Sequence, residues 1–385
     1  MAWKTVRADE FCSFVTDGTH DSPKPQSQGR KLITSKHLKG DYIDFDSANW
    51  ISEGDYQKII ARSAVEQWDI LFSMIGTIGT IYLEKNPIVE YACKNMGVFK
   101  FAGNAENAFW MYYYLKSPQA KGYIQSHLRG STQAYVPLGS LREMPVSIPD
   151  RETRNRIVSL LKPLDEKIAI NRAINDNLQQ QAMALYAEMF LNSSDNNVTS
   201  GTLSDIAVIT MGQSPSGSSY NEDGVGEVFY QGRAEFGFRF PKRRLFTTEP
   251  KRMAETGDVL LSVRAPVGDL NIAYERCCIG RGLGAIHSKT GHSSFVLYTM
   301  FALRSQLDIF NGEGTVFGSI NRDALNAIPI DIPPVTEIDQ FEVVAHPIDE
   351  LIRANYEENC RLEAIRDSLL PKLMSGEIDI SAVQL

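Results

Sequence analysis

The sequence has 385 residues and a formal net charge of −8, and 43% of its residues are hydrophobic while 22% are charged. This length predicts two or three domains, and no apolar run reaches the roughly 20 residues that a membrane helix needs. The acidic balance excludes a uniformly basic nucleic-acid-binding protein, but it leaves room for a local basic patch, because charges are screened beyond about 8–10 Å at physiological salt.

The cysteine content predicts a reduced, cytoplasmic protein. The five cysteines form no CxxC pair and no Cys/His cluster, so they resemble buried thiols rather than disulfides or zinc ligands. They are Cys12, Cys93, Cys277, Cys278 and Cys360. Because the N-terminus, Met1-Ala-Trp-Lys, has no signal-peptide pattern, we expect no membrane association.

The first segment, residues 1–149, has the pattern of a mixed α/β domain. Short β-like runs occur at residues 69–75 and 98–101, and turn-forming residues gather at 17–23. The tyrosines at positions 112–114 lie in an apolar, helix-like stretch. We therefore interpret them as core residues rather than as platforms for base stacking.

A helical segment follows at residues 150–191, with a long helix expected over about 153–191. Its apolar positions alternate spacings of four and three, which is typical of a coiled-coil seam. Asparagine at such positions lowers stability and fixes register. The seam residues are Leu164, Ile168, Asn171, Asn175, Leu178, Ala182, Leu185 and Met189. Pro163 predicts a bend or break in this helix.

The second half of the chain repeats this organisation. A polar run at 192–197 predicts a linker, residues 192–333 form a second mixed α/β segment, and residues 334–385 contain a second helix over about 337–374. Pro347 predicts a bend or break there as well. The second seam consists of Ile348, Ile352, Asn355, Asn359, Leu362, Arg366, Leu369 and Leu373.

The two halves are related by duplication. The sequence Pro-Val-Ser-Ile-Pro at 145–149 is answered by Pro-Ile-Asp-Ile-Pro at 329–333, and identical residues recur in register through the two helices. The globular segments correspond more weakly, at 69–73 and 258–262. We predict an α+β protein with a pseudo-twofold repeat, in which two different globular domains are joined by two long helices that form an antiparallel coiled coil.

Short sequence phrases in this order resemble the specificity subunits of type I restriction–modification systems, over essentially the whole chain. In the first half the phrases are Asp-Gly-Thr-His at 17–20, Ile-Thr-Ser-Lys at 33–36 and the stretch 73–79. In the second half they lie at 212–216, 220–221, 231–232 and 257–260. One departure is the absence of the family's usual Glu-Gln pair after the second Pro-rich edge, where the chain reads Thr-Glu-Ile-Asp-Gln at 336–340.

The resemblance implies a non-catalytic subunit that reads a bipartite site in double-stranded DNA. Each globular domain would be a target-recognition domain for one half-site, and the helices would set the spacer. The subunit would also recruit two methyltransferase (modification) subunits and, through them, restriction/translocase subunits. It would hold no cofactor of its own, since S-adenosylmethionine, ATP and magnesium are expected only in those partners.

The absence of catalytic motifs from the sequence also favours a non-catalytic subunit. The sequence has no GxxxxGK[ST] phosphate loop, no Asn/Asp-Pro-Pro-aromatic methyltransferase motif, no nuclease carboxylate set and no metal spacing of histidines. The pairs Asp165-Glu166 and Asp349-Glu350 follow the two helix prolines. We expect them to stabilise a helix N-terminus, so no catalytic residue is predicted.

Candidate DNA contacts follow from the groups that read bases and bind phosphates. Arginine and lysine suit guanine, asparagine and glutamine suit adenine, and hydroxyls and cations contact phosphates. In the first domain the candidates are Thr19, His20, Arg30, Lys31, Ser35, Lys36, Thr77 and Gln133. In the second they are Gln231, Arg233, Arg239, Lys242, Arg243, Arg244, Arg264 and Thr315. The clusters at 30–36 and 231–244 are the main candidates.

Two other functions fit the same sequence pattern. The chain could serve as the DNA-recognition subunit of another methylation-based phage-defence assembly, or it could be a bivalent protein scaffold without DNA specificity. For any protein of this pattern that reads DNA with both globular domains, the seam predicts a spacer: from Leu164 to Met189 a helix rises about 38 Å at 1.5 Å per residue, close to one turn of DNA.

Overall fold

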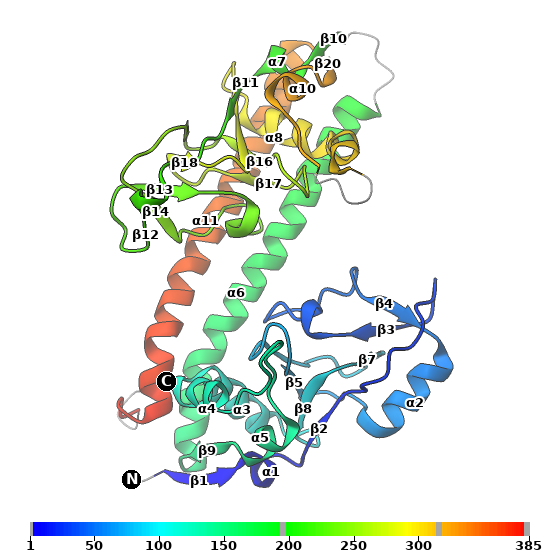
Figure 1. The fold of residues 1–385 in the computed structure, drawn as a ribbon, viewed down its shortest axis with the longest axis vertical. Coiled ribbons are helices and arrows are strands. Elements are labelled where there is room, and N and C mark those ends of the chain that lie inside the picture. Colours follow the sequence, from blue (N-terminus) through cyan, green and yellow to red (C-terminus); the bar gives the residue numbers. More distant parts are fainter. Residues whose placement is uncertain (1–2, 193–197, 313–317, 381–385) are drawn as a thin grey trace. The chain divides into compact units, whose positions relative to one another are not determined.

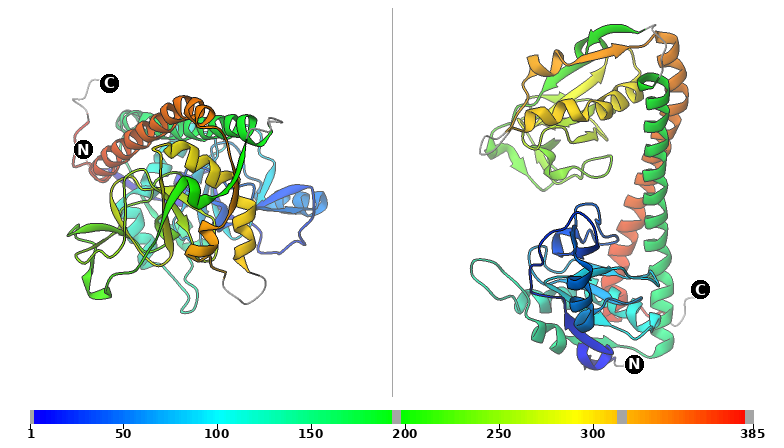
Figure 2. Two further views of the ribbon diagram at one scale, coloured as in Figure 1. Left: turned by 90° about the horizontal axis from the view of Figure 1, so that it is seen from above. Right: turned by 90° about the vertical axis from the view of Figure 1, so that its right-hand side faces the viewer.

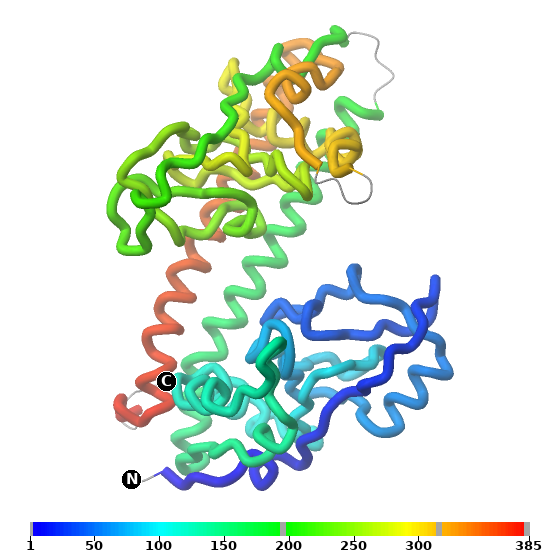
Figure 3. The backbone as a smooth tube through the Cα atoms, viewed as in Figure 1, coloured from blue at the N-terminus to red at the C-terminus, as the bar shows by residue number. Residues whose placement is uncertain are grey.

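The computed structural model describes residues 3–192, 198–312 and 318–380 and divides into two compact units. Unit 1 contains Met1–Asn171 and Glu357–Leu385, and unit 2 contains Arg172–Tyr356. Figure 1 labels most of the helices and strands of both units, and the chain trace in Figure 3 shows the last turns of the C-terminal helix in the same unit as the N-terminal segment. The predicted linker at 192–197 lies outside the described residues except for Asn192.

The described residues of unit 1 form three sheets. An antiparallel four-stranded sheet has the order β2-β8-β5-β6, a three-stranded sheet has the order β4-β3-β7, and β1 pairs with β9. The strands are β1 (Lys4–Arg7), β2 (Phe14–Asp17), β3 (Arg30–Ile33), β4 (Asn49–Ile51), β5 (Ile70–Ser73), β6 (Ile81–Leu83), β7 (Tyr91–Cys93), β8 (Met96–Lys100) and β9 (Pro145–Ile148). The helices are α1 (Ala8–Phe11), η1 (Ser35–His37), α2 (Glu53–Ser63), α3 (Ala105–Lys116), α4 (Pro118–Ser126) and α5 (Leu138–Glu143).

Helix α3 lies in the core of unit 1. The side chain of Asn104 caps it by accepting a hydrogen bond from the backbone N–H of Asn107. Every residue from 108 to 115 is buried, because the helix is apolar on all sides. This burial confirms the prediction that the tyrosines at 112–114 pack in the core.

The described residues of unit 2, like those of unit 1, form a four-stranded sheet, a second sheet and a two-stranded pair, but the second sheet of unit 2 has five strands and not three. Its four-stranded sheet has the order β11-β19-β16-β17, its five-stranded sheet the order β12-β14-β13-β18-β15, and β10 pairs with β20. The strands are β10 (Thr199–Thr202), β11 (Ala207–Met211), β12 (Tyr220–Asn221), β13 (Glu227–Tyr230), β14 (Leu245–Thr247), β15 (Met253–Ala254), β16 (Val259–Ser262), β17 (Leu270–Ile272), β18 (Cys277–Ile279), β19 (Leu283–Ser288) and β20 (Pro329–Ile332). The short helices are α7 (Leu203–Ile206), η3 (Gly217–Ser219), η4 (Arg233–Glu235), α8 (Ser293–Ala302), α9 (Arg304–Asp308), η5 (Ile309–Asn311) and α10 (Arg322–Asn326).

Two long helices complete the fold, and Figure 2 shows them from two further directions. Helix α6 (Arg151–Tyr186) has 36 residues and continues as the π-helical segment η2 (Ala187–Leu191), and α11 (Val335–Ser375) has 41 residues. Both lie close to the predicted ranges. The predicted break at the two prolines is wrong, because both helices continue through Pro163 and Pro347. Fully buried residues hold each helix where the proline removes a hydrogen bond: Leu161 in α6, and Ala345 and Ile352 in α11.

The predicted seam residues lie on one buried or half-buried face of each helix. In unit 1 the Asn171 side-chain amide donates to the Asn359 side-chain oxygen at 2.9 Å. In unit 2 the Asn175 amide donates to the Ile352 carbonyl at 3.2 Å, and Asn355 donates to the Asn175 side-chain oxygen at 2.8 Å. In both units the seam asparagines therefore hydrogen-bond between α6 and α11.

The role expected for Asp165 and Asp349 at helix N-termini is wrong, because both lie inside continuous helices. Asp165 accepts a hydrogen bond from Arg366 at 2.8 Å and lies 3.4 Å from Lys116. Burial opposes ionisation of Asp165, but these two cations outweigh it and hold the pKa of its carboxyl below the usual value. Asp165 is therefore a partner in a half-buried ion-pair network.

The cysteines follow the expectation of buried free thiols with one exception. Cys12, Cys93, Cys277 and Cys278 are free and buried, whereas Cys360 is free but exposed, contrary to the expectation of burial. Within the described residues, no helix combines the length and the apolar character that a membrane span requires.

Candidate DNA interface

In unit 1 a β-hairpin brings three polar segments together. This first hairpin, residues 73–80, joins β5 to β6 and is closed by a hydrogen bond from the Gly79 N–H to the Ser73 carbonyl at 3.0 Å. The Thr77 hydroxyl lies 3.4 Å from the Ser35 carbonyl, so the hairpin meets the turn that carries Ser35 and Lys36. Ile75 forms a β-bridge with Tyr135, which brings the loop of Gln133 to the same hairpin.

The predicted cluster at 30–36 is divided by strand β3. Arg30 stands at the beginning of β3 and Ser35 follows its end, and a strand rises about 3.3 Å per residue, so the two lie at opposite ends. Arg30 is already occupied, because its guanidinium binds Glu53 at 3.0 Å and Glu90 at 2.5 Å. Hydrogen bonds to these carboxylates raise the pKa of Arg30 above its ordinary value.

The remaining candidates of unit 1 differ in exposure. Lys31 donates to the Ala48 carbonyl at 2.9 Å, and its ammonium lies 4.0 Å from the centroid of the Trp50 ring. Thr19 and Ser35 are each 8% exposed, whereas Lys36, Thr77 and Gln133 are exposed. Lys36, Thr77 and Gln133 are thus the candidates that face solvent around the hairpin.

His20 follows the C-terminal end of strand β2, and two side chains fix its position. Its Nε2 lies 2.8 Å from an Asp17 carboxylate oxygen, and its Nδ1 lies 2.9 Å from the Asn95 side-chain oxygen. Arg62 binds the same Asp17 carboxylate. The imidazole is exposed, but both of its ring nitrogens are engaged by these contacts, so a ligand would have to displace Asp17 or Asn95 to hydrogen-bond with it.

Unit 2 has a second hairpin with matching hydrogen bonds. This second hairpin, residues 262–269, joins β16 to β17, and the Gly268 N–H donates to the Ser262 carbonyl at 3.0 Å. The Val263 N–H donates to the Gly282 carbonyl, and the Gly282 N–H donates to the Gln231 carbonyl. Arg264 forms a β-bridge with Ser319. The hairpin therefore gathers the segments of Gln231, Gly282 and Ser319.

The basic cluster at 231–244 is largely neutralised by carboxylates of unit 2. Arg233 binds Asp269, the Arg243 Nη2 donates to Glu275 at 2.8 Å, and Arg244 donates to Glu235 at 2.5 Å. These carboxylates lie 36, 32 and 9 residues away in the sequence. No local spacing signals the pairs with Asp269 and Glu275, so sequence reasoning did not include them.

Arg239 does not fit the prediction of a DNA contact. It is 3% exposed, and its guanidinium lies 3.4 Å from the Asp349 carboxylate and 3.3 Å from the Tyr298 hydroxyl oxygen. A buried guanidinium cannot reach a duplex in this conformation, so Arg239 contacts other residues of the protein and not DNA. Lys242 is exposed and forms no ion pair with any residue that the structure describes. Thr315 lies outside the described residues.

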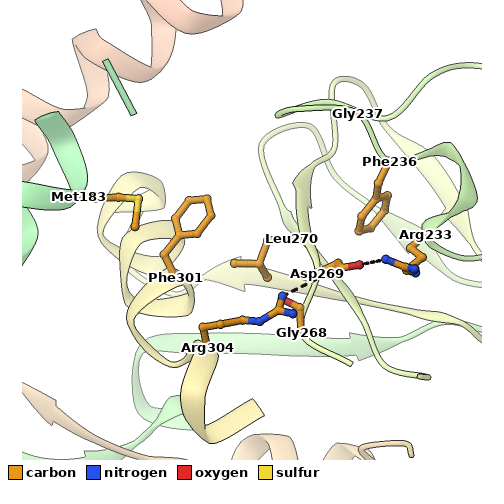
Figure 4. Close-up of a pocket in the computed structure, with 9 residues that line it drawn as sticks. All are labelled: Met183, Arg233, Phe236, Gly237, Gly268, Asp269, Leu270, Phe301 and Arg304. Carbon is orange, nitrogen blue, oxygen red and sulfur yellow. Dashed lines mark hydrogen bonds and ion pairs between the residues drawn. The ribbon is translucent and has the colours of Figure 1, made fainter. Parts of the chain in front are cut away.

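A pocket of about 450 Å³ adjoins the second hairpin. Figure 4 shows its centre, where the Asp269 carboxylate lies between two guanidinium groups, with the rings of Phe236 and Phe301 on the wall. Asp269 binds both Arg233 and Arg304, the latter at 3.0 Å. The two arginines thus share one carboxylate, which positions them beside the hairpin. No group of three or more potential metal-ligating side chains occurs among the described residues.

The comparisons with known proteins agree on one family. The sequence model of the type I restriction modification DNA specificity domain matches residues 2–180 and 196–359. The chain is 27% identical over 404 residues to a putative type I restriction enzyme MjaX specificity subunit from Methanocaldococcus jannaschii, an alignment that covers 98% of this chain and 94% of the relative. A second relative from that organism, the MjaIX specificity subunit, is 22% identical over 90% of this chain and 86% of its own length.

Solved structures bear on the fold alone. The S subunit of a type I restriction-modification system from M. genitalium aligns with a TM-score of 0.54 at 16% identity, over 96% of each chain. The relatives of this chain are thus specificity subunits of type I restriction enzymes, and the family model covers most of its length. This chain belongs to the type I restriction–modification specificity-subunit family.

Proposed function

We propose that this chain is the non-catalytic DNA-specificity subunit of a type I restriction–modification complex and reads a bipartite target. Each unit would contact one half-site through the loops gathered around its hairpin. The observation that carries the proposal is the pair of hairpins with the same backbone hydrogen bonds but different side chains: Ile75 and Thr77 on the first, and Arg264 on the second. Two hairpins with the same backbone arrangement but different side chains suit two half-sites of different sequence.

The spacer between the half-sites would be set by α6 and α11 acting as an antiparallel coiled coil. Support comes from the hydrogen bonds of Asn171, Asn175 and Asn359 within the seam. Asparagine at a seam position costs stability but fixes register. A seam of fixed register keeps a fixed length, which a spacer requires.

The catalytic work would lie in partner subunits. We infer two methyltransferase (modification) subunits and, through them, restriction/translocase subunits, because the relatives are named as specificity subunits of type I restriction enzymes. S-adenosylmethionine, ATP and magnesium would bind those partners. The assembly would work in the cytoplasm, where its DNA substrate is accessible.

Mapping of methylated positions in the source genome tests this function directly. The expected result is a split motif with two unequal half-sites and a fixed gap, which disappears when this chain is deleted. As a matched measurement, the chain assembled with its modification subunits should bind that motif more tightly than a scrambled duplex at moderate salt. Equal affinity for both duplexes, with no motif lost on deletion, would contradict DNA recognition and favour a scaffold without DNA specificity.

A further inference from the structure

The two hairpins place different residues at one structural position. Ile75 and Arg264 are each the third residue of their hairpin, two positions after Ser73 and Ser262. Each forms a β-bridge to the segment that precedes the edge of its globular domain, at Tyr135 and Ser319 respectively. The first hairpin is therefore apolar at the position where the second carries a guanidinium.

The second hairpin holds the Arg264 backbone firmly. Val263, which precedes Arg264, and Val267, three residues after it, are buried, at 2% and 0% exposure. The Ser262 hydroxyl donates to the Pro266 carbonyl at 2.7 Å, and the Ala265 N–H donates to the Gly318 carbonyl at 3.0 Å. A side chain on a turn fixed at these points loses little backbone freedom when it binds a partner.

Arg264 also differs from its basic neighbours in charge pairing. Arg233, Arg243 and Arg244 each bind a carboxylate of unit 2. Arg264 is exposed and forms no ion pair with any residue in the described part of the chain. An arginine without a carboxylate partner keeps its paired N–H donors free for an external acceptor.

We propose that Arg264 is a specificity-determining residue that reads one guanine in the half-site bound by unit 2. This proposal rests on the proposed function and deepens it. Guanine presents its O6 and N7 as a pair of acceptors in the major groove, and a guanidinium matches them with two parallel hydrogen bonds. Ile75 cannot form such a pair, so the half-site bound by unit 1 lacks this particular contact.

The test is a binding selection from randomised duplexes, with the full chain in complex with its modification subunits. The wild-type complex should select a guanine at one position of one half-site. Arg264→Ala should lower the preference for that guanine by about 10-fold to 100-fold and leave the other half-site unchanged. Arg264→Gln should shift the preference at the same position toward adenine, because a glutamine amide matches the adenine edge.

Arg252→Ala is the matched control. Arg252 is exposed, precedes the edge strand β15 and is not part of the second hairpin, and its loss changes the net charge equally. It should leave both half-sites intact. Thermal unfolding of each variant separates loss of the fold from loss of recognition.

Three outcomes would overturn the assignment. The first is an unchanged motif for Arg264→Ala. The second is a loss of affinity that is equal for all sequences, because this marks a phosphate contact. The third is a wild-type motif that has no guanine in the half-site affected by Arg264→Ala. Failure of the proposed function is a different result, since the wild-type complex would then select no sequence at all.

Discussion

The guanidinium of Arg239 lies 3.4 Å from the carboxylate of Asp349, although Arg239 comes from the loop after η4 and Asp349 from the interior of α11. Arg239 is 3% exposed, and the Tyr298 hydroxyl donates to the same carboxylate at 2.9 Å. Within unit 2, one buried ion pair therefore joins the globular domain to the long helix. The cation belongs to the stretch of sequence that had suggested a DNA-binding patch.

Arg239→Ala should destabilise unit 2 by about 3–5 kcal/mol, because removal of one partner leaves the other as an uncompensated buried charge. Burial already raises the pKa of Asp349, and Arg239 partly offsets that effect. Hydrogen exchange in α8, which carries Tyr298, measures the local loss. As a control, Arg243→Ala breaks an ion pair whose arginine side chain is 55% exposed and should cost at most about 1 kcal/mol. Equal losses for the two variants would contradict the role of Arg239.

Asp165 should make the stability of unit 1 depend on acid pH. Its folded pKa lies below the unfolded value of about 3.9, so its contribution to stability is present above that value and is lost as pH falls through the folded pKa. Asp165→Asn should therefore lower the urea midpoint at pH 7 and have little effect near the folded pKa. The pH dependence of stability has the opposite sign for Asp349. Because its folded pKa is raised, its contribution to the stability of unit 2 is present at low pH and is lost as pH rises through the folded pKa. A constant effect of Asp165→Asn across this range would refute the assignment.

The salt dependence of DNA binding should distinguish free cations from paired ones. Lys242→Ala should reduce the slope of log affinity against log salt by about 0.9, the value for one lost phosphate contact. Arg243→Ala should change the slope by less than half as much, because Glu275 already neutralises its guanidinium. Titrations of the assembled complex with DNA at several salt concentrations measure both slopes. A larger change for Arg243→Ala would show that Arg243 exchanges Glu275 for a phosphate.

Insertion of one heptad into each of α6 and α11 should lengthen the spacer of the target. Seven residues add about 10 Å of helix, which corresponds to about three base pairs along the duplex. Methylome mapping of a strain that carries the variant gives the new gap, and both half-sites should be unchanged. A spacer of unchanged length would reject the coiled coil as the element that sets it.

Features that depend on local periodicity were predictable from the sequence. The seam of α6 and α11 was readable because every third or fourth residue must face the same side of a helix, and the burial of Ile168, Asn171 and Asn359 follows that pattern. The tyrosines at 112–114 were readable for a related reason, since a helix that is apolar all round must be buried.

Features that depend on tertiary contacts were not predictable. The positive charge of the cluster at 231–244 is partly offset by Asp269 and Glu275, which reach it from the β16–β17 hairpin and from the segment before β18. The continuity of α6 at Pro163 depends on packing that local propensity does not contain. The equivalence of Arg264 and Ile75 likewise depends on tertiary contacts, namely their β-bridges to Ser319 and Tyr135.

The buried carboxylates also bear on the replacement of one globular domain by a foreign one. Asp165 takes one of its cations, Arg366, from the second long helix, so any domain grafted in front of α6 would still find a positive charge in place. Asp349 instead forms its ion pair with Arg239 of the globular domain itself. A foreign domain inserted at residues 192–333 would have to bring its own buried arginine. The two positions in the chain should therefore differ in how freely they accept new domains, the first being permissive and the second selective.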